Sequence, residues 1–156
     1  MFREMRLKEN MTTHEEAVAM FKEATNGVLA VMGDEGYPYA VPVSFVYEDG
    51  KIYFHSTSSI SHKIDSIVKN PRVSFCVVLQ DQIVPQEFNT LYRSAIAFGK
   101  ARILSEADDI KHGIMCILNK YSKDYIDSGL AYRDAEDGNF CVVEIEIEHM
   151  TGKAGS

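Results

Sequence analysis

A dense group of hydroxyl and basic side chains lies in one short segment of the chain. Its members are Ser56, Thr57, Ser58, Ser59, Ser61, His62 and Lys63. If a helix begins near Ser61, both basic side chains fall beside the unpaired N–H groups and partial positive charge of its first turn, which is unfavourable. A bound phosphate would remove this conflict, because helix N-termini and hydroxyl groups hold phosphate well. The alternative is that Ser61 only caps the helix while the other hydroxyls face water.

A second segment of chemical interest is the predicted strand over residues 37–47, which contains Pro38 and Pro42. Proline has no N–H to donate, so it is typical of edge strands. Since the two prolines are four residues apart, their missing donors lie along the same edge. We infer that this edge is only partly paired, and that the backbone of Pro42, Val43 and Ser44 could lie against a flat heterocycle. Judged by the strand pattern alone, a plain sheet edge is the favoured interpretation.

Other kinds of catalytic or metal site find little support in the sequence. His55 and His62 are seven residues apart with no cysteine or carboxylate at ligand spacing, so we expect no zinc site there. There is no G-x-S-x-G or G-x-G-x-x-G motif. The row Glu144, Glu146 and Glu148 is interpreted as the solvated face of a strand. What remains is a phosphate-bearing cofactor that supplies chemistry the side chains lack.

The elements that must position these residues follow from the hydrophobic periodicity. Capping boxes begin at Thr13 and Ser105, and Gly99 predicts a bend or bulge within a long strand. We expect helices over residues 13–25, 61–70 and 105–121, with a short helix and a loop within 122–138. We expect a loop over 80–90, and strands over residues 28–32, 37–47, 51–55, 73–79, 91–104 and 141–148.

The order of these elements predicts the fold class. The first three strands follow one another with no helix between them, and the second and third are joined by a tight turn at Glu48-Asp49-Gly50. This order disfavours a doubly wound α/β fold and favours a closed or split β-barrel. We therefore predict a mainly β fold with flanking helices, built on six antiparallel strands.

Length and composition set the broad class of protein. The 156 residues fit one domain over 1–156, with residues 1–12 as an N-terminal arm. The net charge of −7 argues against general nucleic-acid binding and against anionic membranes, and no apolar run is long enough to span a bilayer. Neither a signal peptide nor paired cysteines are evident, so we expect buried free thiols and a cytoplasmic location. His112 is interpreted as a surface residue, and Cys116 as one of the buried thiols.

Several short motifs, in a shared order, resemble one known family. They are Gly36-Tyr37-Pro38-Tyr39, Val41-Pro42-Val43, Ile52-Tyr53-Phe54-His55-Ser56, Lys63-Ile64-Asp65, Asn70-Pro71-Arg72-Val73-Ser74-Phe75, Tyr92-x-Ser94, Phe98-Gly99-Lys100-Ala101 and Met150-Thr151-Gly152-Lys153. In this order they resemble the pyridoxamine 5′-phosphate oxidase-related, FMN-binding split-barrel superfamily, and the resemblance covers about residues 27–153. Within it, the chain is most similar to the nitroimidazole-resistance (5-nitroimidazole reductase) group.

The resemblance implies a six-stranded antiparallel split β-barrel that forms a homodimer, with FMN bound at the subunit interface. It places Pro42, Val43 and Ser44 against the isoalloxazine ring. It assigns the remaining cofactor contacts to His55 and Ser56 at a strand end, to Ser61, His62 and Lys63 at the phosphate, and to Ser94 near the flavin pocket. His55 is also the candidate catalytic residue, for substrate positioning or proton delivery.

The implied activity is an FMN-dependent oxidoreductase that takes electrons from NAD(P)H and reduces a small acceptor such as a nitroaromatic. The chain departs from the family pattern between His55 and Lys63, where the loop is one residue longer and has no glycine. Three alternatives remain open at this point. They are FMN binding without turnover, as a store or sensor; a haem-binding relative with His55 or His62 as axial ligand; and an interaction module with no ligand.

Overall fold

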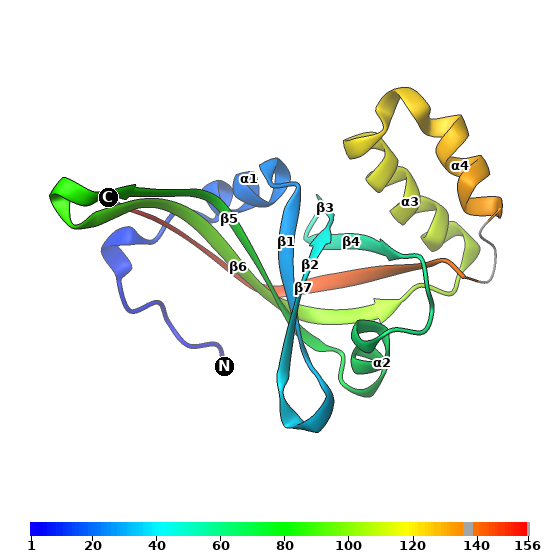
Figure 1. Cartoon of the computed structure of the whole chain (residues 1–156), viewed down its shortest axis with the longest axis horizontal. Coiled ribbons are helices and arrows are strands. Elements are labelled where there is room, and N and C mark those ends of the chain that lie inside the picture. Colours follow the sequence, from blue (N-terminus) through cyan, green and yellow to red (C-terminus); the bar gives the residue numbers. More distant parts are fainter. Residues whose placement is uncertain (136–138, 156) are drawn as a thin grey trace.

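One antiparallel sheet forms the body of the molecule (Figure 1). The computed structural model describes residues 1–135 and 139–155. Within these residues, seven strands pair in the order β2-β1-β5-β6-β7-β4-β3. Their bounds are β1 Asn26–Met32, β2 Pro38–Ser44, β3 Val46–Glu48, β4 Lys51–Ser56, β5 Arg72–Val84, β6 Asn89–Ile103 and β7 Cys141–Gly155. The mainly β, antiparallel prediction is confirmed, whereas the count of six strands is wrong.

The extra strand arises because the segment predicted as one strand over 37–47 is divided at Phe45. The part before Phe45 is β2, which pairs with β1, and the part after it is β3, which pairs with β4. These pairings put β2 and β3 at opposite ends of the sheet order. The sheet is therefore not closed by hydrogen bonds, but its two ends are consecutive in the chain. The prolines correctly predicted that β2 is an edge strand.

The break at Phe45 is held by two side chains from the end of helix α3. Phe45 belongs to neither flanking strand, and its N–H donates to the Tyr121 hydroxyl at 3.1 Å. Its carbonyl accepts from Lys120 Nζ at 3.1 Å, and the same ammonium lies 4.5 Å above the Phe45 ring. Phe45 is fully buried, so these contacts supply the partners that its backbone N–H and carbonyl require.

Four α-helices flank the sheet in the described part of the chain. Their bounds are α1 His14–Glu23, α2 His62–Lys69, α3 Ala107–Tyr121 and α4 Ile126–Ala135. The capping box at Thr13 and Glu16 is confirmed. The second one, at Ser105, is wrong, because Glu106 occupies the N-cap and makes no side-chain cap. The short helix expected within 122–138 is confirmed as α4, and residues 136–138 of that segment lie outside the described residues.

Strands β5 and β6 form a long hairpin that extends away from α3 and α4 (Figure 1). The loop predicted over 80–90 is wrong, because pairing continues to Val84 and Asn89 and only residues 85–88 turn. The bulge predicted at Gly99 is confirmed by a register shift between Phe98 and Gly99. A Cβ at Gly99 would lie 2.2 Å from the carbonyl oxygen of Glu146, so only glycine fits there.

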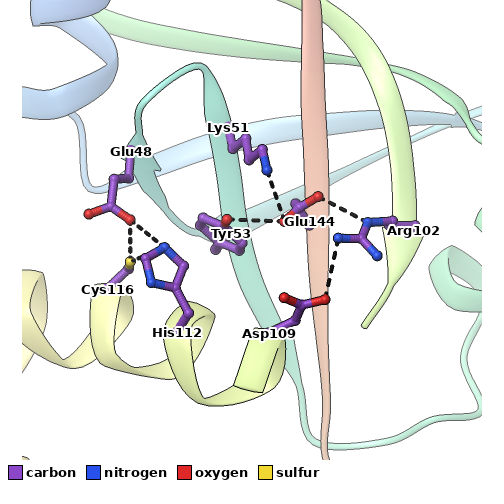
Figure 2. A network of polar contacts seen from close by, with 8 residues as sticks. All are labelled: Glu48, Lys51, Tyr53, Arg102, Asp109, His112, Cys116 and Glu144. Carbon is purple, nitrogen blue, oxygen red and sulfur yellow. Dashed lines mark hydrogen bonds and ion pairs between the residues drawn. The ribbon is translucent and has the colours of Figure 1, made fainter. Parts of the chain in front are cut away.

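The acidic row on β7 is only partly solvated. Glu146 and Glu148 are exposed as predicted, but Glu144 is only 5% exposed, so its assignment to the solvated face is wrong. Its carboxylate accepts hydrogen bonds from the Tyr53 hydroxyl and from Arg102 Nε, both at 3.0 Å (Figure 2). Burial alone would raise the pKa of Glu144, but these two donors hold it below its usual value. Glu144 is therefore a buried anion that joins β4, β6 and β7.

Two further expectations concern membranes and cysteines. Among the helices of the described residues, none is both long enough and apolar enough to cross a membrane. All three cysteines are free, and Cys116 and Cys141 are buried, whereas Cys76 is partly exposed. The expectation of free thiols is thus confirmed, and complete burial is confirmed for two of them.

We expect Tyr121→Phe to lower the free energy of unfolding by about 1–3 kcal/mol, because it leaves the N–H of Phe45 buried without a partner. Urea denaturation followed by circular dichroism measures this loss. The matched control is Tyr125→Phe, because Tyr125 is 69% exposed. A loss no larger than that of the control would contradict the role given to Tyr121.

Candidate functional site

The segment that leads from β4 into α2 is fixed by its own hydroxyl groups. Ser56 Oγ donates to the carbonyl of Ser58, and Ser58 Oγ donates to the carbonyl of Ile60, each at 2.8 Å. Ser61 is the N-cap of α2, and its hydroxyl accepts the N–H of Ile64 at 3.4 Å. Such hydroxyl-to-backbone bonds stabilise turns without glycine. They explain how this longer, glycine-free loop holds its shape.

His62 is turned toward the β1–β2 connection. Its ring stacks on Tyr39 with the centroids 4.1 Å apart, and its Nε2 accepts the N–H of Asp34 at 3.1 Å. These contacts join the start of α2 to the turn that follows β1. The His62 imidazole therefore has protein partners on its face and at one nitrogen. Ser61 and Lys63 are then the main candidates for contact with a phosphate.

Lys63 occupies the first turn of α2, where a basic side chain is unfavourable unless an anion is near. Within residues 1–135 and 139–155, none of the ion pairs includes Lys63. Its ammonium is close enough to His55 to disfavour a second positive charge there. The half-buried side chain is thus a cation at a helix N-terminus, which is a favourable arrangement for an anion.

His55 and Ser44 line one cavity of about 480 Å³. The walls come mainly from α3 and α4, and include Ile114, Ile117, Leu118, Tyr121, Ser122, Gly129, Tyr132, Arg133 and Phe140. The His55 ring stacks on Phe140 with a centroid distance of 5.3 Å and an interplanar angle of 15°. Mostly apolar walls with a few polar groups are typical of sites for small organic ligands.

The sequence did not predict the contribution of α3 and α4 to this cavity. Tyr121, Tyr132 and Phe140 are aromatic residues in and beside a segment interpreted as a polar helix and loop. Aromatic residues in a segment that is otherwise polar were a signal of a covered surface, but their partner surface on β2 and β4 is distant in sequence. Only the folded chain brings them to Ser44 and His55.

The three residues assigned to the flavin ring alternate along the edge strand β2. Pro42 and Ser44 are exposed, whereas Val43 lies on the opposite face and packs against the core. A ligand at this edge could contact the Pro42 and Ser44 side chains but would reach Val43 only through its backbone. The structure thus places Ser44 and His55 in the same cavity. It also leaves one edge of β2 without a strand partner.

Ser94 lies apart from this cavity. It is on β6, opposite Val78 of β5 and Lys153 of β7. It lines a separate cavity of about 250 Å³, whose other residues include Ile96 and Phe98 on the same face of β6. A single chain therefore does not bring Ser94 into the cavity that holds Ser44 and His55.

The outer face of the sheet carries a row of apolar side chains across four strands. The register pairs Pro42 with Val28, Val28 with Cys76, and Cys76 with Ile96. Val28 is 38% exposed and Ile96 is 41% exposed. A contiguous exposed apolar surface of this kind is typical of a protein contact surface.

The family model for pyridoxamine 5′-phosphate oxidase matches residues 13–154, which is nearly the whole chain. The chain belongs to the pyridoxamine 5′-phosphate oxidase family. The resemblance drawn from the sequence motifs is thereby confirmed at the level of the family. No curated protein matches this family member.

Solved structures similar to this pyridoxamine 5′-phosphate oxidase-family chain include flavoproteins. A candidate 5-nitroimidazole antibiotic resistance protein from Bacteroides thetaiotaomicron is 27% identical, with a TM-score of 0.75, and the match covers 92% of this chain and 85% of that one. An FAD-binding protein from Mesorhizobium loti is 22% identical, with a TM-score of 0.65 and coverages of 94% and 97%. The flavocytochrome Anf3 from Azotobacter vinelandii is 18% identical, with a TM-score of 0.74 and coverages of 97% and 72%. The last two likenesses concern the fold alone.

The pKa of His55 gives a test of the local electrostatics in this family member. Loss of hydration where the ring is covered, together with the Lys63 charge, lowers the pKa below the ordinary 6.5. His55 is then neutral at pH 7, and the free energy of unfolding decreases as the pH falls below 6.5, because the unfolded chain takes up this proton first.

We expect Lys63→Gln to raise the pKa of His55 toward its ordinary value, because the neighbouring positive charge is removed. NMR titration of the histidine ring signals measures the shift. The control is Lys69→Gln, at the other end of α2, which should leave the His55 titration unchanged. An equal pKa of His55 in wild type and in Lys63→Gln would show that the His55 imidazole and the Lys63 ammonium do not interact.

Proposed function

We propose that this chain binds FMN and is a flavin-dependent oxidoreductase that passes electrons from NAD(P)H to a small acceptor such as a nitroaromatic. The proposal rests on one observation in this member of the family. The cationic side chain of Lys63 lies at the N-terminus of α2, and it has no ion-pair partner among the described residues. The edge strand β2 and the cavity that contains Ser44 and His55 complete the site.

The phosphate would be held where β4 leads into α2. Lys63 would supply a charge-assisted contact, and the first-turn N–H groups of α2 would supply further donors. The Ser61 hydroxyl accepts the N–H of Ile64, which leaves its own hydrogen available to donate to a phosphate oxygen. These groups fit a phosphate ester, because each is a donor and no carboxylate of the described residues pairs with Lys63.

The flat ring would lie along the edge of β2. Pro42 and Ser44 face outward there, and the backbone edge near Pro42 lacks one donor because of the proline. When bound, the flavin would supply hydride acceptance and electron transfer, which no side chain can provide. The protein would orient the ring through the Pro42–Ser44 backbone, and the α3 and α4 walls would exclude water from the substrate side.

His55 would serve on the substrate side of the site. It lines the cavity and is held flat against Phe140, so the orientation of its imidazole is defined. A neutral imidazole can accept a proton or a hydrogen bond from a small polar molecule. The nitroaromatic acceptor is suggested by the solved structure named as a candidate 5-nitroimidazole antibiotic resistance protein, and the cavity has room for a ring of that size.

We propose, in addition, that the functional unit is a homodimer joined through the outer face of the sheet. The apolar row Pro42, Val28, Cys76 and Ile96 supports this face as the contact. Ser94 lies on the same face, next but one to Ile96 along β6. A second copy could therefore place its Ser94 near the β2 edge of the first, and one chain alone could not.

We expect Lys63→Ala to weaken FMN binding by about 1–3 kcal/mol, or about 5- to 150-fold, because a charge-assisted contact is lost. Quenching of flavin fluorescence during titration measures the dissociation constant. Lys69→Ala is the matched control. Equal affinities of wild type and Lys63→Ala would reject the phosphate assignment. Bound FMN without NAD(P)H oxidation would reject the oxidoreductase activity and leave a store or sensor.

We expect wild type to sediment as a dimer and Ile96→Glu to sediment as a monomer, because a charge on the apolar row cannot be buried without a partner. Analytical ultracentrifugation measures the mass of both. The control is Val68→Glu, which changes an exposed apolar residue of α2. A monomeric wild type, or a dimeric Ile96→Glu variant, would exclude this face as the dimer contact.

A further inference from the structure

A group of three side chains with metal-ligand chemistry lies outside the proposed flavin site. His112 and Cys116 are four residues apart on α3, so they lie on the same face of the helix. Glu48 is the last residue of β3 and points toward both of them (Figure 2). The sequence interpretation treated His112 as a surface residue and Cys116 as a buried thiol, and it did not connect either with Glu48.

The donor atoms of the three side chains converge. Glu48 Oε2 lies 2.7 Å from His112 Nε2 and 2.7 Å from Cys116 Sγ. The sulfur lies 3.6 Å from His112 Nε2. All three potential ligand atoms therefore lie within 4.8 Å of one another. The thiol is largely buried, whereas the imidazole and the carboxylate are about half exposed, so the group is open to solvent on one side.

These separations are close to those of a tetrahedral zinc site. With bonds of about 2.3 Å to sulfur and about 2.1 Å to nitrogen or oxygen, neighbouring ligand atoms lie about 3.4–3.6 Å apart. The sulfur-to-nitrogen distance of 3.6 Å already meets this requirement. Only the Glu48 carboxylate would have to move back, by about 0.7–0.9 Å, and it lies on a half-exposed side chain that can rotate.

We propose that Glu48, His112 and Cys116 bind a zinc-class divalent cation, with water as the fourth ligand. A thiolate, an imidazole and a carboxylate together suit zinc rather than magnesium or calcium, which prefer oxygen ligands alone. Three protein ligands with one open position are also the usual composition of an accessible zinc site.

A nucleophilic Cys-His-Glu site is a less suitable interpretation of the same residues. Burial and the hydrogen bond to Glu48 raise the pKa of the Cys116 thiol to about 12, so it keeps its proton at neutral pH. A thiol in that state is a poor nucleophile. A coordinated cation removes the proton from a thiol outright, so the same sulfur can serve as a metal ligand.

The proposed cation would join two parts of the fold that line the cavity of Ser44 and His55. Glu48 precedes the turn between β3 and β4, and β4 carries His55. Helix α3 carries Ile114, Ile117 and Leu118 of the cavity wall. Binding at Glu48, His112 and Cys116 would hold α3 against the β3–β4 hairpin, and it would raise the melting temperature because the cation binds only the folded chain.

The experiment uses the full-length chain without an affinity tag, reduced and freed of metal by a chelator. Co²⁺ replaces zinc as a spectroscopic probe, and Zn²⁺ affinity is measured by competition with a chromophoric chelator. The expected result is a single bound ion, a thiolate-to-cobalt charge-transfer band, and the intense visible bands of a tetrahedral ion. Absence of the charge-transfer band would overturn the proposal.

The variants Cys116→Ser, His112→Gln and Glu48→Gln should each weaken Zn²⁺ binding. For the cysteine and histidine variants we expect at least about a 100-fold loss, since even outer-shell changes cost about 10- to 100-fold. The matched controls are Cys76→Ser and His149→Gln, which leave all three proposed ligands in place. Circular dichroism verifies that each variant is folded. Zn²⁺ affinity that is the same in wild type and in a folded Cys116→Ser or His112→Gln variant would overturn the proposal.

Discussion

The hydrogen bonds at the backbone of Phe45 are the constraint on which the remainder of the structure depends. At this residue the chain leaves one end of the sheet and enters the other, so its N–H and carbonyl have no strand partner. Tyr121 and Lys120 supply those partners from the end of α3. The same contacts fix Ser44, the last residue of β2, next to the strand pair that carries His55. The cavity between them is thus a consequence of how the sheet is broken.

The curled sheet has two functional consequences of different kinds. On its inner side the core is filled by large aromatic side chains, among them Phe21, Phe45 and Phe75, which pack against one another. The proposed ligand site lies instead at the edge of the sheet, where β2 is unpaired on one side, and at the segment where β4 leads into α2. On its outer side the sheet presents the apolar row that includes Val28 and Ile96. A second copy that covers this row would also bring new residues to the β2 edge.

Local sequence signals predicted a large part of this architecture. The Thr13 capping box, the N-cap at Ser61, the edge strand marked by Pro42 and the bulge at Gly99 each depend on a few neighbouring residues, and each is confirmed. The motifs in their shared order also identified the family, which the match over residues 13–154 confirms.

The features that the sequence did not predict depend on contacts between distant segments. The alternation of side chains runs through Phe45 without interruption, and the break there is stabilised by Tyr121 and Lys120 of α3, which are distant in sequence. Glu144 looks solvated beside Glu146, but Tyr53 lies 91 positions away in sequence and still reaches its carboxylate. Glu48 meets Cys116 across 68 positions in the same way. Pattern and propensity carry no information on such pairs, because both describe only neighbours in the chain.

We propose that FMN binds with its phosphate at the N-terminus of α2 and with its ring along the edge of β2. A crystal structure of the chain with FMN tests it most directly. The account predicts the phosphate within hydrogen-bond distance of Lys63 Nζ and the first-turn N–H groups of α2, the ring against Pro42–Ser44, and Ser94 of the partner subunit nearby. A phosphate bound elsewhere, with Lys63 turned to solvent, would contradict the account.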